Sequence, residues 1–119
     1  MKDNFMLEKT YAFALRIAKL CRYLVEEKRE FVISKAVLVS GIEIAAQLEE
    51  ANQAPERTNF IHHFSNANKQ ASRTNLFLRL LRDGDFINEK QARSLLDDCE
   101  EIQKLLVTSL KTSRRNLEG

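Results

Sequence analysis

Two pairs of adjacent residues have the side chains with which proteins do acid–base and metal chemistry. Glu49 and Glu50 could act as general acid and base, and His62 and His63 could bind a metal ion. Neighbouring residues on a helix point about 100° apart, so neither pair can converge on one substrate atom or one ion. The histidines also lack the Glu-x-x-His spacing of di-iron bundles. We therefore expect no catalytic residue, no metal and no cofactor.

The two glutamates fit a contact better than they fit catalysis. They stand near the end of a predicted helix, where carboxylates oppose the helix dipole and need a compensating cation. Arg57, just beyond the only proline, is the candidate for that cation. Glu49, Glu50 and Arg57 are therefore either solvated ion pairs or residues of a subunit interface.

Gly41 interrupts a segment that otherwise reads as helix, SGIEIAAQLEEA at 40–51. A glycine inside a helix costs about 1 kcal/mol relative to alanine, so we expect a close contact there. If the second and third helices run antiparallel about residue 54, Ser40 lies abreast of Lys69 and Gly41 abreast of Asn68. Two interpretations stay open: a packing or polar layer that fixes helix register, or a small polar pocket formed by Ser40, Asn68 and Lys69.

The same construction predicts charged pairs between the third and fourth helices. A turn near residue 85 puts Lys69 opposite Glu101 and Arg73 opposite Asp97. We expect these residues to form ordinary ion pairs between helices.

Basic residues are the remaining functional lead. They gather on the first helix (Arg16, Lys19, Arg22), at the end of the third (Arg79, Arg82) and at the C-terminus (Lys111, Arg114, Arg115). In a bundle whose helices alternate in direction, Arg22 and Arg82 share one pole, which the C-terminus does not reach. On a monomer these charges would be solvated, whereas around an oligomer they would form a multivalent surface for phosphates.

Four helices must position these residues. Apolar residues recur at steps of three and four along four segments that short turns connect. Long helices with short connections lie antiparallel to their neighbours, so we predict an all-α, up-down-up-down antiparallel four-helix bundle in a single domain, 1–119. The predicted helices span about residues 4–27, 31–53, 56–82 and 88–113.

The first helix carries two neighbouring apolar stripes. We take as its buried face the stripe at alternating steps of four and three, which comprises Leu7, Tyr11, Ala14, Ala18, Cys21 and Val25. A second stripe widens this face and comprises Phe13, Ile17, Leu20 and Leu24. The second helix is apolar over more than half its circumference, so one partner helix would not cover it.

The connections carry their own signals. The run EEKRE at 26–30 has no apolar periodicity and predicts a solvated turn. Gly84 suits a left-handed backbone after the third helix. Asn88, followed three residues later by Gln91, predicts a capping box that opens the fourth helix.

Charge and composition narrow the class of protein. The formal charge of +2 is weakly basic and does not by itself indicate a nucleic-acid partner. No apolar run reaches the ~20 residues of a membrane span and no secretory signal is visible, so we expect a cytoplasmic protein without a membrane partner. Cys21 and Cys99 lack a zinc or redox spacing and should be buried in the core.

Several short motifs in the central helices carry a family resemblance. They are Ser40-Gly41, Ile44-Ala45, Glu49-Glu50-Ala51, Asn59-Phe60-Ile61, Lys69 with Ala71 and Thr74, and Leu78-Arg79-Leu80-Leu81. In this order the sequence resembles the four helix bundle proteins encoded in intervening sequences of bacterial 23S ribosomal RNA genes. It also resembles the related accessory variability determinant of diversity-generating retroelements, a basic pentamer that binds a reverse transcriptase and nucleic acid. The resemblance implies a four-helix protomer that assembles as a homopentamer and has no enzymatic activity.

Two functions are favoured over a third, a small-ligand or metal enzyme that would use Ser40, Lys69 and the paired glutamates. The first is a non-enzymatic oligomeric scaffold that binds nucleic acid, RNA in particular, through repeated basic residues. The second is a scaffold for protein–protein interaction alone, whose apolar surface serves self-assembly and a protein partner. Binding that weakens steeply with salt would distinguish the first from the second.

Overall fold

The computed structural model describes residues 4–53 and 56–118, with the backbone alone for Asn4, Arg57, Leu117 and Glu118. This part of the chain forms four helices and no strand. α2 begins two residues later than predicted, and α4 continues past the predicted end at 113. The helices are α1 (Asn4–Glu27), α2 (Ile33–Gln53), α3 (Arg57–Asp83) and α4 (Glu89–Glu118).

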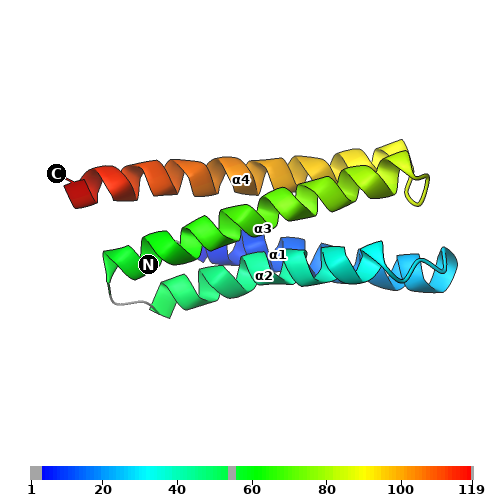
Figure 1. Ribbon diagram of the computed structural model, residues 1–119, viewed down its shortest axis with the longest axis horizontal. Helices are drawn as coiled ribbons and strands as arrows, with labels where there is room; N and C mark the ends of the chain where they lie inside the picture. Colours follow the sequence, from blue (N-terminus) through cyan, green and yellow to red (C-terminus); the bar gives the residue numbers. More distant parts are fainter. Residues whose placement is uncertain (1–3, 54–55, 119) are drawn as a thin grey trace.

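The helices alternate in direction and form a four-helix bundle, as predicted (Figure 1). The bundle is elongated, with extents of 50 × 21 × 21 Å. α2 packs along α1 and α3, and α3 along α4, whereas α1 and α4 approach each other more sparsely. None of the described helices has the length and hydrophobicity that a membrane span requires.

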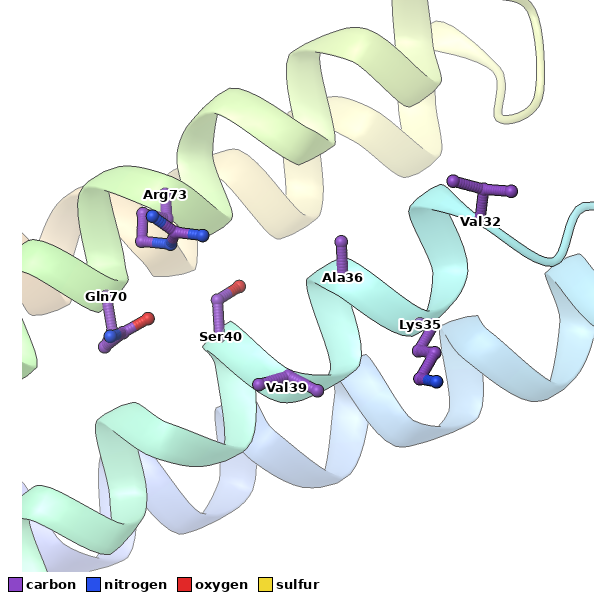
Figure 2. A pocket seen from close by; sticks show the side chains of 7 residues that line it. All are labelled: Val32, Lys35, Ala36, Val39, Ser40, Gln70 and Arg73. Atoms are coloured by element: carbon purple, nitrogen blue, oxygen red, sulfur yellow. The ribbon is translucent and has the colours of Figure 1, made fainter.

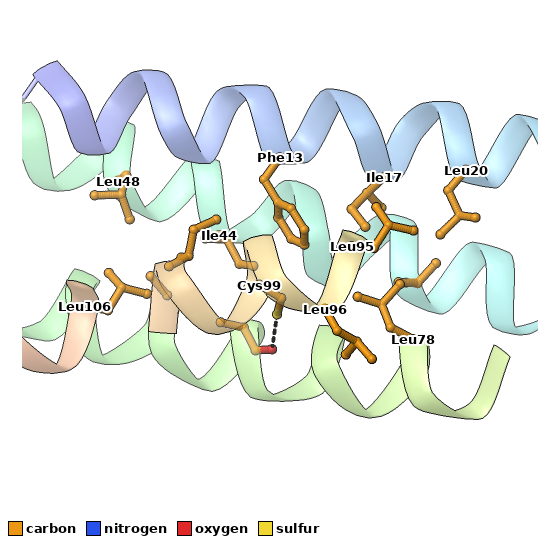
Figure 3. Packing of buried hydrophobic residues seen from close by; sticks show 14 of the residues in the cluster. Phe13, Ile17, Leu20, Ile44, Leu48, Leu78, Leu95, Leu96, Cys99 and Leu106 are labelled. Atoms are coloured by element: carbon orange, nitrogen blue, oxygen red, sulfur yellow. Dashed lines mark hydrogen bonds between the residues drawn. The ribbon is translucent and has the colours of Figure 1, made fainter. Parts of the chain in front are cut away.

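One hydrophobic core runs between the four helices. Figure 3 shows Phe13 and Ile17 of α1 together with Ile44 of α2, Leu78 of α3 and Leu106 of α4, all at most 2% exposed. Burial of these apolar side chains supplies the main driving force for the fold.

The predicted buried face of α1 was correct for the stripe of Phe13, Ile17, Leu20 and Leu24 and at Cys21, but wrong at other residues of the first stripe. Tyr11 is 66% exposed and Val25 is 37% exposed, while Leu7 is only half-buried. The stripe predicted to widen the face is in fact its centre: the buried residues of α1 are Met6, Thr10, Phe13, Ile17, Leu20, Cys21 and Leu24. Both stripes have helical spacing, so only the packing of the other helices decides which one faces the core.

The α1–α2 connection is capped by a buried carboxylate. Glu30 is only 9% exposed, so the prediction of a solvated turn was wrong at this residue. Its carboxylate accepts the backbone N–H groups of Val32, Ile33 and Ser34 at 3.1, 2.9 and 2.7 Å. Burial alone would raise the pKa of Glu30, but these hydrogen bonds outweigh it and hold the pKa below its usual value. The cap explains why α2 begins at Ile33 rather than at 31.

The α3–α4 connection differs from the prediction in one residue. Gly84 has an ordinary φ of −85°, and Asp85 takes the left-handed conformation with a φ of 64°. The glycine is needed for space, because a Cβ there would lie 3.0 Å from the Leu80 carbonyl oxygen. The predicted capping box is confirmed: Gln91 N–H donates to Asn88 Oδ1 at 2.8 Å, and Asn88 N–H donates to Gln91 Oε1 at 2.9 Å.

Candidate functional site

A groove of about 400 Å³ lies between α2 and α3 (Figure 2). Lys35 and Arg73 contribute cations to its walls, and no carboxylate lines it. The lining residues are Val32, Lys35, Ala36, Val39, Ser40, Gln70 and Arg73. The groove therefore offers an apolar and cationic surface rather than a set of catalytic groups.

Ser40 is a buried member of this groove and is bonded within the bundle. Its hydroxyl lies 2.8 Å from Thr74 Oγ1 and 3.3 Å from the Val37 carbonyl oxygen. Thr74 Oγ1 also lies 2.9 Å from the Gln70 carbonyl oxygen, so each hydroxyl has a backbone acceptor and either one can be the donor between the two. No described histidine or carboxylate hydrogen-bonds to either hydroxyl, so the pair is not activated as a nucleophile.

The predicted register between α2 and α3 was wrong. Ser40 faces Thr74 rather than Lys69. Gly41 faces α1 instead of Asn68: a Cβ on Gly41 would lie 2.9 Å from Ile17 Cγ2 and 3.0 Å from Ile17 Cγ1. Adjacent residues point about 100° apart, so Ser40 and Gly41 face different neighbours. A close approach of helices at Gly41 is confirmed, with a different partner.

The predicted polar pocket of Ser40, Asn68 and Lys69 is not formed. Asn68 lines a separate groove of about 360 Å³ between α3 and α4. Lys69 is exposed and lines neither groove. The three residues therefore lie on different faces.

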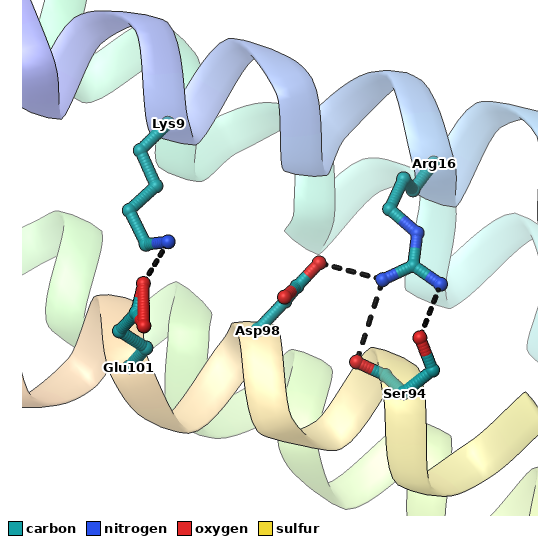
Figure 4. Close-up of polar contacts among 5 residues, drawn as sticks. All are labelled: Lys9, Arg16, Ser94, Asp98 and Glu101. Carbon is teal, nitrogen blue, oxygen red and sulfur yellow. Dashed lines mark hydrogen bonds and ion pairs between the residues drawn. The ribbon is translucent and has the colours of Figure 1, made fainter. Parts of the chain in front are cut away.

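The predicted pairs between α3 and α4 are also absent among the described side chains. Glu101 pairs with Lys9 of α1 (Figure 4), and Asp97 lies 3.3 Å from Arg93 Nη1 on its own helix. Arg73 instead lies 6.0 Å from the centre of the Phe77 ring.

A polar chain joins the C-terminal half of α2 to the start of α3. Gln47 donates to Glu43 Oε1 at 2.9 Å, and its own Oε1 lies 2.8 Å from His63 Nδ1. Glu50 Oε2 lies 3.4 Å from the same nitrogen, and Glu49 is exposed. The side chain of Arg57, the predicted partner of these glutamates, lies outside the described residues.

The two histidines diverge, as expected. The His62 ring lies 3.3 Å from Asn66 Nδ2, on a different side of α3 from the chain that His63 joins. Among the described residues no group of three His, Cys, Asp or Glu side chains could hold a metal ion.

Arg16 is engaged within the bundle. Its Nη1 donates to Asp98 Oδ2 at 2.6 Å, and its Nη2 donates to Ser94 Oγ at 2.9 Å (Figure 4). These contacts, with the Lys9–Glu101 pair, tie α1 to α4 where the two helices pack sparsely. A guanidinium already paired in this way is less available to an outside phosphate.

The other basic candidates are exposed. Lys19 and Arg22 lie on α1, and Lys19 lines a groove of about 430 Å³ between α1 and α4. Lys111 and Arg115 lie near the end of α4, where Arg114 Nη2 donates to Ser65 Oγ at 3.2 Å. The two groups lie toward opposite poles, as predicted from the helix directions (Figure 1).

Both cysteines are buried in the core, as predicted. Cys21 Sγ donates to the Ser34 carbonyl oxygen at 3.0 Å, and Cys99 Sγ to that of Ala71 at 3.3 Å (Figure 3). Burial, with a smaller contribution from nearby carboxylates, raises the pKa of Cys21 to about 11 and that of Cys99 to about 12. Both thiols are protonated at neutral pH and are poor nucleophiles or metal ligands.

The roles of Thr74 and Glu30 were not predicted, although the sequence contains a signal for each. Thr74 occupies a buried position of the α3 stripe, and Ser40 occupies one of the α2 stripe, so two hydroxyls at core positions could have been paired. Glu30 stands three residues before the start of α2, within reach of its first free N–H groups.

The chain resembles known proteins over nearly its whole length. Residues 2–108 match the family model described as 23S rRNA-intervening sequence protein. A solved structure from Bacteroides thetaiotaomicron VPI-5482, a protein with unknown function from the S23 ribosomal protein family, is 42% identical. The match covers 93% of this chain and 99% of that chain, with a TM-score of 0.90. No curated protein matches. The chain belongs to the 23S rRNA-intervening sequence protein family.

Proposed function

We propose that the protein is a non-enzymatic, self-assembling helical scaffold, a homopentamer, that binds nucleic acid, RNA in particular. The observation that carries this proposal is the amount of apolar surface that a single protomer leaves uncovered. Helices with apolar residues on most of their circumference are buried in the functional state of a protein. In this protein another subunit is the natural cover.

The uncovered apolar residues lie mainly on α1, α2 and α3. Tyr11 and Leu15 are exposed on α1, and Val39 and Ile42 on α2. Val39 also lines the groove between α2 and α3, and it is 60% exposed. Exposed apolar surface of this extent is typical of a protein–protein interface.

The apolar residues lie on more than one face, which favours a ring. Leu76 and Leu80 are exposed on α3, whereas Tyr11 and Leu15 are exposed on α1. A contact between two different faces of neighbouring copies is heterologous, and such contacts close into rings when the rotation allows it. The number of five subunits rests on the resemblance to the pentameric relatives.

Assembly would also allow the modest positive charge of each protomer to support phosphate binding. Each protomer has a formal charge of only +2, but a ring repeats every exposed lysine and arginine around its axis. Several contacts to phosphates made by one assembly give a higher overall affinity than a single contact. Each contact releases counterions, so this affinity falls steeply as the salt concentration rises. Of the predicted candidates, Lys19, Arg22, Lys111, Arg114 and Arg115 are exposed on each protomer, and they lie on two separate surfaces.

The test has two measurements on the unmodified protein. Light scattering on the protein eluting from a sizing column should give a mass near five protomers of 13.8 kDa each. A labelled RNA titrated with the assembly should bind at low salt, with log K falling linearly as log salt rises. A monomer, or an assembly that leaves RNA unbound at low salt, contradicts the proposal.

A scaffold for proteins alone is the second candidate, because the same apolar surface supports it. It predicts an oligomer of the same mass that does not bind RNA, or that binds it without dependence on salt. The RNA titration therefore separates the two functions, while the mass tests the part they share.

A further inference from the structure

We infer that the nucleic acid binds as a phosphodiester backbone along the α3–α4 face, in the half of the molecule that holds the C-terminus. This inference rests on the proposed function and adds the site. The exposed cations on α1 belong to a different surface. Three features support this site: a face without carboxylates, a groove with polar side chains that are free to bind a ligand, and a row of cations.

Two stretches of the chain contain no acidic residue. Residues 57–82 hold five lysines and arginines, residues 102–117 hold four, and neither stretch holds any of the 17 aspartates and glutamates. The first stretch is almost all of α3, and the second is the C-terminal half of α4. Such a separation leaves nothing within either stretch to neutralise its positive charge.

The fold places these stretches side by side. Arg114 Nη2 donates to Ser65 Oγ at 3.2 Å, and Gln103 Nε2 donates to Ser72 Oγ at 3.4 Å. The N-terminal half of α3 therefore lies against the C-terminal half of α4. Their shared face therefore combines two segments without carboxylates, so little negative charge repels an approaching anion.

A groove runs along this face with polar groups available to a ligand. It has a volume of about 360 Å³ and is lined by Asn68, Ser72, Gln103, Lys104, Val107 and Thr108. The side chains of Gln103 and Ser72 are bonded to each other, whereas the side chains of Asn68 and Thr108 make no hydrogen bond to a described residue. Amides and hydroxyls between cations are the groups that commonly contact phosphate and sugar oxygens.

Cations follow the groove along α4. Lys104 and Lys111 are two helical turns apart, about 10 Å along the axis, and Arg115 follows one turn later. All three are exposed, and none pairs with a described carboxylate. Residues 89–101 of the same helix hold two cations and five carboxylates, and Arg93 there is paired with Asp97, so the excess positive charge of α4 lies in its second half.

These features favour a nucleic-acid backbone over bases. The only large apolar residue of the groove is Val107, and no aromatic ring lines it for a base to stack on. We therefore expect binding with little sequence preference. An acidic protein segment would use the same cations, and competition separates it from a polynucleotide.

The experiment compares two double variants that remove equal charge. Lys104→Ala with Lys111→Ala removes the row beside the groove, and Lys19→Ala with Arg22→Ala removes the exposed pair on α1. Each is titrated by fluorescence anisotropy against labelled single-stranded RNA of mixed sequence across a salt series. Double-stranded RNA, single-stranded DNA and polyglutamate serve as unlabelled competitors, and light scattering confirms that assembly is unchanged.

The expected result is a specific loss in the first variant. The Lys104/Lys111 variant should bind roughly tenfold more weakly at low salt, with a salt slope smaller by about 1.4, while the Lys19/Arg22 variant stays within about twofold of the unmodified protein. Equal losses in both variants, or a loss only in the second, overturn the site while leaving the proposed function intact. Competition by polyglutamate as strong as that by RNA overturns the polynucleotide as ligand. If the unmodified protein binds no RNA, the proposed function itself fails.

Discussion

Gly41 is the residue at which the backbone of α2 comes closest to α1. The space that a methyl group would need is taken by the Cγ1 and Cγ2 atoms of Ile17, at 3.0 and 2.9 Å. A β-branched side chain in a helix has one strongly preferred rotamer, so Ile17 cannot easily move away. The glycine is therefore explained by packing, and its hydroxyl neighbour Ser40 by the bond to Thr74.

Gly41→Ala should destabilise the protein, although alanine favours helix. The gain in helix propensity is about 1 kcal/mol, and overpacking of a tight core costs about 1–3 kcal/mol. We expect a net loss of about 1 kcal/mol in the free energy of unfolding, measured by urea denaturation at fixed protein concentration.

Removing the obstacle should reverse the sign of that effect. In an Ile17→Ala background the space beside Gly41 is open, so Gly41→Ala should stabilise relative to that background. An increase in stability from Gly41→Ala in the unmodified protein would show that Ile17 yields easily and that close packing does not explain the glycine.

Among the helices, α2 shows most clearly how one side chain sets an element boundary. The Glu30 carboxylate takes up three N–H groups at the start of the helix, and Ser34 Oγ donates back to the Glu30 carbonyl oxygen at 2.8 Å. A negative charge at a helix N-terminus also interacts favourably with the helix dipole. Arg29, with a φ of 54°, turns the chain so that Glu30 can reach these groups.

Glu30→Gln should cost about 1–2 kcal/mol of stability at neutral pH, because the amide keeps the shape of the cap but loses its charge. The pKa of Glu30 is lowered in the folded protein, so the stabilisation is present above the unfolded-state pKa and is lost as pH falls through the folded-state pKa. The difference in stability between the variant and the unmodified protein should therefore be largest at neutral pH. It should disappear below about pH 4. Thermal unfolding across this pH range measures it.

Glu26→Gln is the matched control for this change. Glu26 is an exposed glutamate in the last turn of α1, and its replacement should leave stability almost unchanged. A Glu30→Gln difference that stays constant down to acidic pH would argue against a charged cap.

In the whole molecule the polar groups of the interior are satisfied, but many apolar side chains on the surface are uncovered. The buried side-chain nitrogen and oxygen atoms of the described residues all have hydrogen-bond partners. The exposed apolar residues of α1, α2 and α3 have no comparable explanation within one protomer. This contrast is the physical basis of the proposed self-assembly.

Val39→Glu with Ile42→Glu should dissociate the proposed assembly into folded protomers. Both side chains are exposed in the protomer, so the helix content and the core should persist, while burying two carboxylates in an interface is strongly unfavourable. Light scattering should then give a mass of 13.8 kDa, with an unchanged far-UV circular dichroism spectrum.

Val107→Glu on α4 introduces the same chemistry on another face. Val107 is exposed on α4, away from the apolar residues of α1 and α2, so this variant should keep the mass of the unmodified assembly. An unchanged mass for the α2 variant, or equal dissociation by both variants, would contradict a place for Val39 and Ile42 in the proposed interface.

Much of the fold could be predicted from periodicity alone. The apolar spacing located four helices, and Asn88 with Gln91 identified the start of α4. These signals are local, since they depend on residues three or four apart on the same helix. The motifs of the central helices likewise identified the family.

Tertiary structure alone decided which residues meet. The rotation of α1 about its axis could not be predicted, because its two apolar stripes have the same spacing. The register of α2 on α3 could not be predicted either, because Ser40 and Gly41 face different helices. The candidate site was affected most: Arg16 proved to be paired with Asp98, while the carboxylate-free face needed α3 and α4 to be placed side by side. A sequence fixes the period of a helix, but rotation and register depend on how side chains from separate helices fit together.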